Sequence, residues 1–183
     1  CDLIFAQGTA LAEKCRRWNR NVHIFPFGVS LESFARRGKS DEAGAPDDLR
    51  HIRRPIIGYV GGLHRHVDFE LLERIAQRRD WSLVLVGPIQ AGACPPSNNE
   101  NVFLLGEKNF SQLADYVDQF DVCIIPYVQS EYTKTVYPTK LNEYHALGKP
   151  VVSTALPELV AFNERYGSLI RLAGTHAQFI AQL

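Results

Sequence analysis

The sequence contains no methionine, no long apolar run and no excess of either charge. Twenty lysines and arginines balance twenty aspartates and glutamates, so the formal net charge is zero. Nucleic-acid-binding domains carry a clear basic excess, and nucleic acid is therefore not expected as a partner. The apolar runs fall well short of the roughly 18 residues of a membrane span, which argues against an integral membrane chain. A hydrophobic content of 45% is also too high for a disordered tail.

Cysteine is scarce as well, with four residues at positions 1, 15, 94 and 123. They form no CxxC pair and have no HxxxH nearby. Metal ligation and a disulfide framework are therefore both disfavoured, and a reducing compartment is the default. The chain begins at Cys1 without a signal-peptide pattern. Because a native reading frame starts with methionine, we expect the chain to be a fragment of a larger protein.

Short apolar runs rich in β-branched residues alternate with helical patterns. The runs lack polar alternation, which favours strands buried on both faces, as in a parallel sheet. Helices are predicted after Asp68, after Ser111, from about Pro138 to Leu147, and near Thr175. The sequence thus predicts an α/β fold, a Rossmann-like three-layer α/β/α domain with a mostly parallel sheet of about six strands. The expected strands are residues 22–25, 56–60, 83–86, 102–105, 122–125, 150–153 and 169–172.

A glycine pair follows one of these apolar runs. Gly61 and Gly62 precede three basic side chains, those of His64, Arg65 and His66. In an open α/β sheet, ligands bind beyond the carboxyl ends of the strands, and glycine lets the backbone approach an anion closely. The functional interpretation is a phosphate-binding turn. The alternative is a plain tight turn followed by a solvated basic loop.

A second segment, residues 130–143, follows another of the expected strands. Lys140 lies in the first turn of the predicted helix, where it opposes the helix dipole at a cost of about 0.3–1 kcal/mol unless an anion binds there. Thr139, Lys140 and Glu143 share one helix face, and a carboxylate on that face can accept hydrogen bonds from a diol. The alternative is an exposed Lys–Glu pair without a ligand.

These segments, in this order, resemble the C-terminal nucleotide-sugar-binding domain of GT-B fold glycosyltransferases of glycosyltransferase family 4. The resemblance covers about residues 20–172. Residues 1–20 are then the end of a missing N-terminal acceptor domain or a linker, and residues 21–183 are the donor-binding domain. The matching segments are 21–34 ("v.viPnGvd…F"), 57–62 (the first strand and turn), 83–87 and 102–106 (the next two strands), 113–126 ("l..y...advfv.P") and 140–154 ("l.EamA.GkPVv.t").

The resemblance implies an enzyme of polysaccharide biosynthesis. It would use a UDP- or GDP-linked sugar and transfer the glycosyl group to a saccharide or lipid-linked acceptor with retention. No cofactor and no obligatory metal are expected. The fragment is expected to be inactive alone, because the catalytic groups would lie mainly on the missing domain. The implied location is the cytoplasm, with peripheral contact to the inner face of the membrane through that domain.

The family's functional residues carry over in part. Glu143 takes the place of the second acid of the family's Glu, seven residues, Glu motif, which implies that it binds the donor ribose. The first acid falls at Thr135, which with Tyr137 is expected at the donor sugar. The family's arginine and lysine fall near Gly62 and near His66 or Asp68, so neither cation is present. The residues expected to bind the donor diphosphate are Gly61, Gly62, His64, Arg65, Thr139 and Lys140.

Two other functions stay open. A nucleotide-sugar epimerase would use the same fold and the same kind of substrate. A receiver-type α/β signalling domain, which is not an enzyme of this kind, would need an acceptor aspartate at the carboxyl end of a central strand. This chain has Pro126 and Tyr127 after the strand in question, which disfavours that function.

Overall fold

Apolar runs form one parallel sheet in the computed structural model, which describes residues 1–34 and 45–183. Its strands are β3 (Ile56–Val60), β4 (Ser82–Val86), β5 (Val102–Gly106), β6 (Val122–Ile125), β7 (Val151–Thr154) and β8 (Ile170–Ala173). They lie in the order β5-β4-β3-β6-β7-β8, and each neighbouring pair is parallel. Strands β3 and β4 are buried at every position. The predicted parallel α/β sheet is confirmed.

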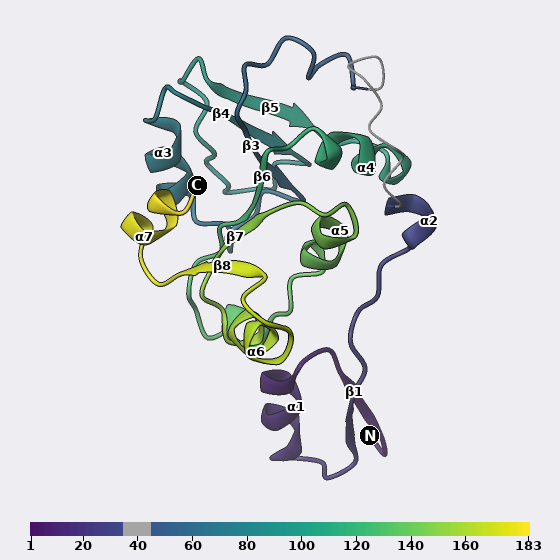
Figure 1. The fold of residues 1–183 in the computed structure, drawn as a ribbon. Coiled ribbons are helices and arrows are strands. Elements are labelled where there is room, and N and C mark those ends of the chain that lie inside the picture. Colours follow the sequence, from purple (N-terminus) through teal and green to yellow (C-terminus); the bar gives the residue numbers. More distant parts are fainter. Residues whose placement is uncertain (35–44) are drawn as a thin grey trace.

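Amphipathic segments between the strands form layers on both faces of the sheet (Figure 1). One layer contains α3 (Phe69–Ala76) and α7 (His176–Ala181), which contact each other. The other contains α4 (Phe110–Asp118) and α5 (Lys140–Ala146), with the short α2 (Leu31–Phe34) packed against both. Helix α6 (Pro157–Tyr166) packs against β8. In the described ranges, no helix has both the length and the apolar character needed to cross a membrane.

Helix starts follow local capping chemistry. Asp68 caps α3 as predicted, because its carboxylate accepts a hydrogen bond from the Leu71 N–H at 2.9 Å. The predicted cap at Ser111 is wrong, since α4 begins at Phe110, two residues before the start that a cap at Ser111 would give, and is capped by Asn109. The Asn109 N–H donates to the side chain of Gln112 at 3.3 Å, so the reciprocal arrangement of a capping box starts the helix before Ser111 is reached.

The strand order reverses between β3 and β6. The chain runs from β3 outward through β4 to β5, then returns to β6 and runs outward through β7 to β8. Such a reversal leaves a crevice beyond the carboxyl ends of the two central strands, where doubly wound folds bind their ligands. Strand β3 ends directly before Gly61, and β6 ends before Pro126. The two segments singled out in the sequence therefore meet at one edge of the sheet.

A small N-terminal unit packs on α6 (Figure 1). A buried carboxylate of α6 contacts the first turn of the helix in this unit. Glu158 accepts hydrogen bonds from the backbone N–H groups of Thr9 at 3.1 Å and Ala10 at 2.6 Å. The unit contains β1 (Ile4–Ala6), α1 (Thr9–Arg16) and β2 (Val22–Ile24). The sequence predicts residues 22–25 as a strand of the large sheet, but the structure pairs β2 in parallel with β1, outside that sheet. In this pairing the apolar side chains of Ile4 and Val22 lie at opposite positions of the two strands.

Tight packing at Gly58 yields a stability test. A Cβ atom at this central position of β3 would overlap the ring of Phe120, which is 1% exposed. Overfilling a close-packed core costs about 1–3 kcal/mol, so Gly58→Ala should lower the free energy of unfolding in urea by that amount. Gly28→Ala is the control, because nothing lies within 4 Å of a Cβ atom there. Equal stability of the two variants would contradict the packing described.

Candidate functional site

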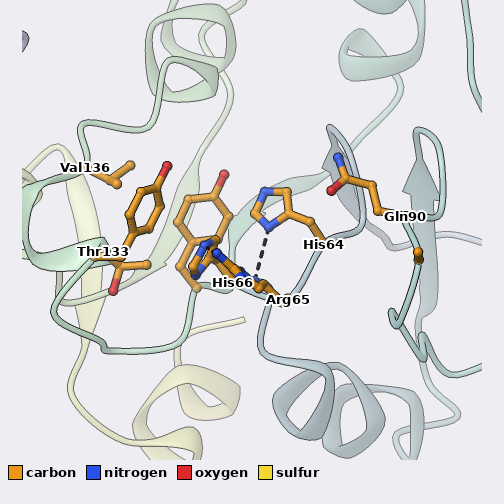
Figure 2. A pocket seen from close by; sticks show the side chains of 9 residues that line it. His64, Arg65, His66, Gln90, Thr133 and Val136 are labelled. Carbon is orange, nitrogen blue, oxygen red and sulfur yellow. Dashed lines mark hydrogen bonds between the residues drawn. The ribbon is translucent and has the colours of Figure 1, made fainter.

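A cavity of about 490 Å³ opens at the carboxyl edge of the sheet, beside the ends of β3 and β6 (Figure 2). Its walls come from the loops that follow β3, β4 and β6. In Figure 2, His64 lies between Gln90 on one side and Thr133 and Val136 on the other. None of the described residues that line it carries a carboxylate. The lining consists of His64, Arg65, His66, Gln90, Ala91, Tyr127, Tyr132, Thr133 and Val136.

Lys140, the first residue of α5, extends its side chain to this edge and contacts the face of the Tyr127 ring. The residue is 8% exposed. Its Nζ donates a hydrogen bond to the Tyr127 hydroxyl at 2.6 Å and lies 4.8 Å and 5.2 Å from the ring centroids of Tyr127 and Tyr59. No carboxylate of the described residues forms a salt bridge with it. The alternative of an exposed Lys140–Glu143 pair is therefore wrong, because Lys140 is buried and the two groups form no salt bridge, although their charges interact through space.

Tyr59 is a neutral group. Burial raises the pKa of Tyr59 well above its usual range, and the nearby Tyr127 raises it further. The Tyr59 hydroxyl donates to the Gly62 carbonyl oxygen at 3.1 Å, which ties the glycine turn to the core. The two rings thus offer Lys140 their π faces, and Tyr127 offers it one hydroxyl oxygen.

The glycine turn lies against Lys140 because it lacks side chains. Gly61 has φ of 141°, and a Cβ atom there would lie 3.3 Å from Cε of Lys140. Gly87 has φ of 142°, and a Cβ atom there would overlap the Gly61 carbonyl oxygen. This close approach lets the Gly61 N–H donate to the Val86 carbonyl at 2.8 Å. The Gly62 N–H has no hydrogen-bond partner in the described part of the chain, so it can serve a ligand.

The histidines that follow the turn are held in the neutral form. The Nδ1 atom of His64 accepts a hydrogen bond from the His66 N–H at 3.2 Å, which places the ring proton on Nε2. Burial lowers the pKa of His64, and the charge of Lys140 lowers it further. Burial and the charge of Arg65 likewise lower the pKa of His66. The His66 ring stacks on Tyr132, with 4.2 Å between the ring centroids.

Glu143 lies one turn along α5 from Lys140. Its carboxylate is half-buried and has no hydrogen-bond partner in residues 1–34 and 45–183. Burial raises the pKa of Glu143, and the positive charge of Lys140 partly opposes this. Glu143 does not line the 490 Å³ cavity itself. An unpartnered, half-buried acid is costly to keep, which marks it as a candidate for binding hydroxyl groups.

The other predicted residues lie apart from this group. Thr135 ends the short η2 (Thr133–Thr135), and its hydroxyl donates to the Tyr132 carbonyl at 3.0 Å. Thr139 is exposed at the start of α5. Tyr137 donates to the Asn142 side chain at 2.7 Å and lines a second cavity of about 580 Å³, which lies beside the small N-terminal unit. The structure therefore brings Gly61, Gly62, His64, Arg65 and Lys140 together and places Tyr137 elsewhere.

Sequence reasoning missed Tyr59, Tyr127 and Gln90. Both tyrosines sit in apolar stretches at the ends of the two central strands, where a large ring is indistinguishable from core. The signal that could have identified them is their position at the ends of the two strands between which the strand order reverses. In the described ranges, no three His, Cys, Asp or Glu side chains are grouped so that they could hold a metal ion.

Comparisons with known proteins identify the family of this chain. Residues 54–183 match the family described as glycosyl transferases group 1. TuaH of Bacillus subtilis (strain 168), whose name assigns it to teichuronic acid biosynthesis as a glycosyltransferase, is 31% identical over 160 residues. That match covers 84% of this chain and 39% of TuaH.

Solved structures share the fold at low identity. WaaG, a glycosyltransferase involved in lipopolysaccharide biosynthesis, superposes with a TM-score of 0.72 at 14% identity, over 97% of this chain and 51% of WaaG. The E. coli trehalose-6-phosphate enzyme bound with UDP-2-fluoro glucose gives a TM-score of 0.60 at 12% identity, over 88% of this chain and 43% of that one. The chain thus spans about half the length of these structures, or less. The family match extends over most of the chain, and this protein belongs to the group 1 glycosyltransferases.

Proposed function

We propose that this chain binds the donor of a glycosyl transfer, a nucleoside-diphosphate sugar linked to UDP or GDP, at the edge between β3 and β6. The observation that carries the proposal is Lys140, a buried ammonium beside a glycine turn that forms no salt bridge with a carboxylate of residues 1–34 or 45–183. A charge removed from water requires a counter-charge, and a diphosphate supplies one. Lys140 and the free Gly62 N–H would bind its oxygens, and Glu143 would accept hydrogen bonds from the ribose.

The transfer itself breaks the bond between the anomeric carbon and a diphosphate oxygen. Negative charge builds up on the leaving diphosphate, and fixed positive groups stabilise it most where water is excluded. In the proposed site, Lys140 supplies the charge and His64 a neutral Nε2–H donor, so that no metal is needed. Family membership favours transfer over epimerisation and over a receiver-type domain.

The acceptor belongs to the same proposal. The names of TuaH and WaaG refer to teichuronic acid and to lipopolysaccharide biosynthesis, which supports a saccharide or lipid-linked acceptor. Retention of the anomeric configuration follows the family expectation. The acceptor and the retention both concern the activity of a whole enzyme. This chain corresponds to 51% of WaaG.

Lys140→Met should weaken nucleotide binding about 10- to 100-fold. The reason is the loss of a hydrogen bond from a charged donor, which contributes about 1.5–3 kcal/mol. The measurement is calorimetric titration of the 183-residue chain with UDP and with GDP, each with and without EDTA. Lys134→Gln is the matched control, because Lys134 carries the same charge on the neighbouring η2, where it is exposed and paired with Glu131.

Each result of this titration has a definite meaning. Binding of one nucleotide that survives EDTA, weakens in Lys140→Met and is unchanged in Lys134→Gln supports the proposal. If the folded chain binds neither nucleotide, the proposed donor site is wrong. Loss of binding in EDTA would overturn its independence from metal.

Glu143→Gln should stabilise the chain and weaken its nucleotide binding. Because burial raises the pKa of Glu143 in the folded state, the unfolded chain ionises first as pH rises, and stability falls through that window. Glutamine does not ionise, so the variant should be more stable than the parent at pH 7, with the difference shrinking below about pH 4.3, the ordinary pKa of glutamate.

Urea unfolding at both pH values and titration with the nucleotide measure these two effects. Glu73→Gln, an exposed change on α3, is the control for removing a charge. A variant that is less stable than the parent at pH 7 would show that the Glu143 carboxylate supports the fold instead of a ligand.

A further inference from the structure

The Lys140 ammonium has one hydrogen-bond partner in the described part of the chain, the hydroxyl of Tyr127. A lysine ammonium sits on a flexible four-carbon stem, so its position is fixed only by the groups that it contacts. Here it lies beside the glycine turn, where a Cβ atom at Gly61 would be 3.5 Å from Nζ. The contact that holds Nζ therefore keeps the charge at that turn.

Tyr127 is itself held by the backbone on both of its sides. The Asp68 N–H donates to the Pro126 carbonyl at 2.7 Å, and the Val128 N–H donates to the His66 carbonyl at 3.0 Å. These two hydrogen bonds join the segment that follows β6 to the loop that follows β3. Because Tyr127 is also 7% exposed, its hydroxyl has a fixed place relative to the glycine turn.

The other ring beside Lys140 makes a different contact. The ring centroid of Tyr59 lies 5.2 Å from Nζ, but the Tyr59 hydroxyl donates to the Gly62 carbonyl. Tyr127 provides both a ring face, with its centroid 4.8 Å from Nζ, and a hydrogen-bond acceptor at 2.6 Å. An ammonium has three N–H donors, so two of them remain for a ligand when Tyr127 accepts one.

We propose that Tyr127 is a positioning residue of the donor site, because its hydroxyl holds the Lys140 ammonium at the glycine turn where that ammonium binds the diphosphate. The inference rests on the proposed donor site and adds a residue to it. Tyr127 acts through Lys140, so its hydroxyl contributes to nucleotide affinity only when the ammonium is present. A purely structural role would instead give a loss of affinity that does not depend on Lys140.

The test is a double-mutant cycle, measured by calorimetric titration of the 183-residue chain with UDP and with GDP. Tyr127→Phe keeps the ring and removes the hydroxyl. It should weaken nucleotide binding about 2- to 10-fold, as for the loss of one hydrogen bond. In a chain that already carries Lys140→Met, the same change should have almost no effect on nucleotide binding.

Tyr116→Phe is the matched control, because it removes another buried hydroxyl beside a lysine. Tyr116 lies on α4 and is 4% exposed, and its ring centroid is 5.3 Å from Nζ of Lys108. Its hydroxyl donates to the Asp48 carboxylate at 2.9 Å, and it does not line the 490 Å³ cavity. This variant should bind the nucleotide as tightly as the parent. Urea unfolding checks that every variant is folded.

The cycle separates this inference from the donor site itself. If the folded parent binds neither nucleotide, or if Lys140→Met binds as tightly as the parent, the donor site is wrong and the inference falls with it. If Lys140→Met weakens binding and Tyr127→Phe does not, the donor site stands and only the inference is overturned. An equal loss from Tyr127→Phe with and without Lys140 also overturns it. A Tyr127→Phe chain that fails to fold does the same, because the hydroxyl then serves the fold.

Discussion

The burial of one ammonium group, that of Lys140, sets the chemistry at the edge of this sheet. Tyr59 and Tyr127 take over part of its lost hydration through their ring faces and one hydroxyl, and both lie there because β3 and β6 are neighbours. The Tyr59 ring supplies no negative charge, since burial raises the pKa of its hydroxyl. The strand reversal, the glycine turn and the start of α5 therefore converge on a buried cation that forms no salt bridge with the described carboxylates.

The backbone around this cation is shaped by the same constraint. Gly87 lets the end of β4 touch the Gly61 carbonyl, and Gly61 in turn lies against the Lys140 side chain. Glu143 adds a half-buried carboxylate on the same helix without neutralising the ammonium through a salt bridge. Two partly buried charges of opposite sign that form no salt bridge lower the stability of the folded chain. Residues that lower stability in this way are typical of ligand sites.

The sequence predicted what short-range patterns determine and missed what depends on distant packing. Continuous apolar runs identified the six-stranded parallel sheet, and the glycine pair identified the turn at its edge. The aromatic enclosure of Lys140 was not predictable, because it depends on which strands become neighbours. Tyr137 was assigned to the sugar, but residues 130–139 form irregular turns in which no periodicity fixes side-chain direction, and its ring lines the other cavity.

Helix α5 connects the edge of the sheet beside β3 and β6 with the small N-terminal unit. Lys140 and Glu143 belong to the candidate site, whereas the Asn142 side chain between them donates to the Phe27 carbonyl at 2.9 Å, in the segment that leaves β2. Glu158 holds the other end of that unit by accepting from the first turn of α1. A displacement of the small unit must therefore break the Asn142–Phe27 hydrogen bond or move the helix that carries Lys140. The position of the ammonium is thus coupled through one helix to the segment that precedes the large sheet.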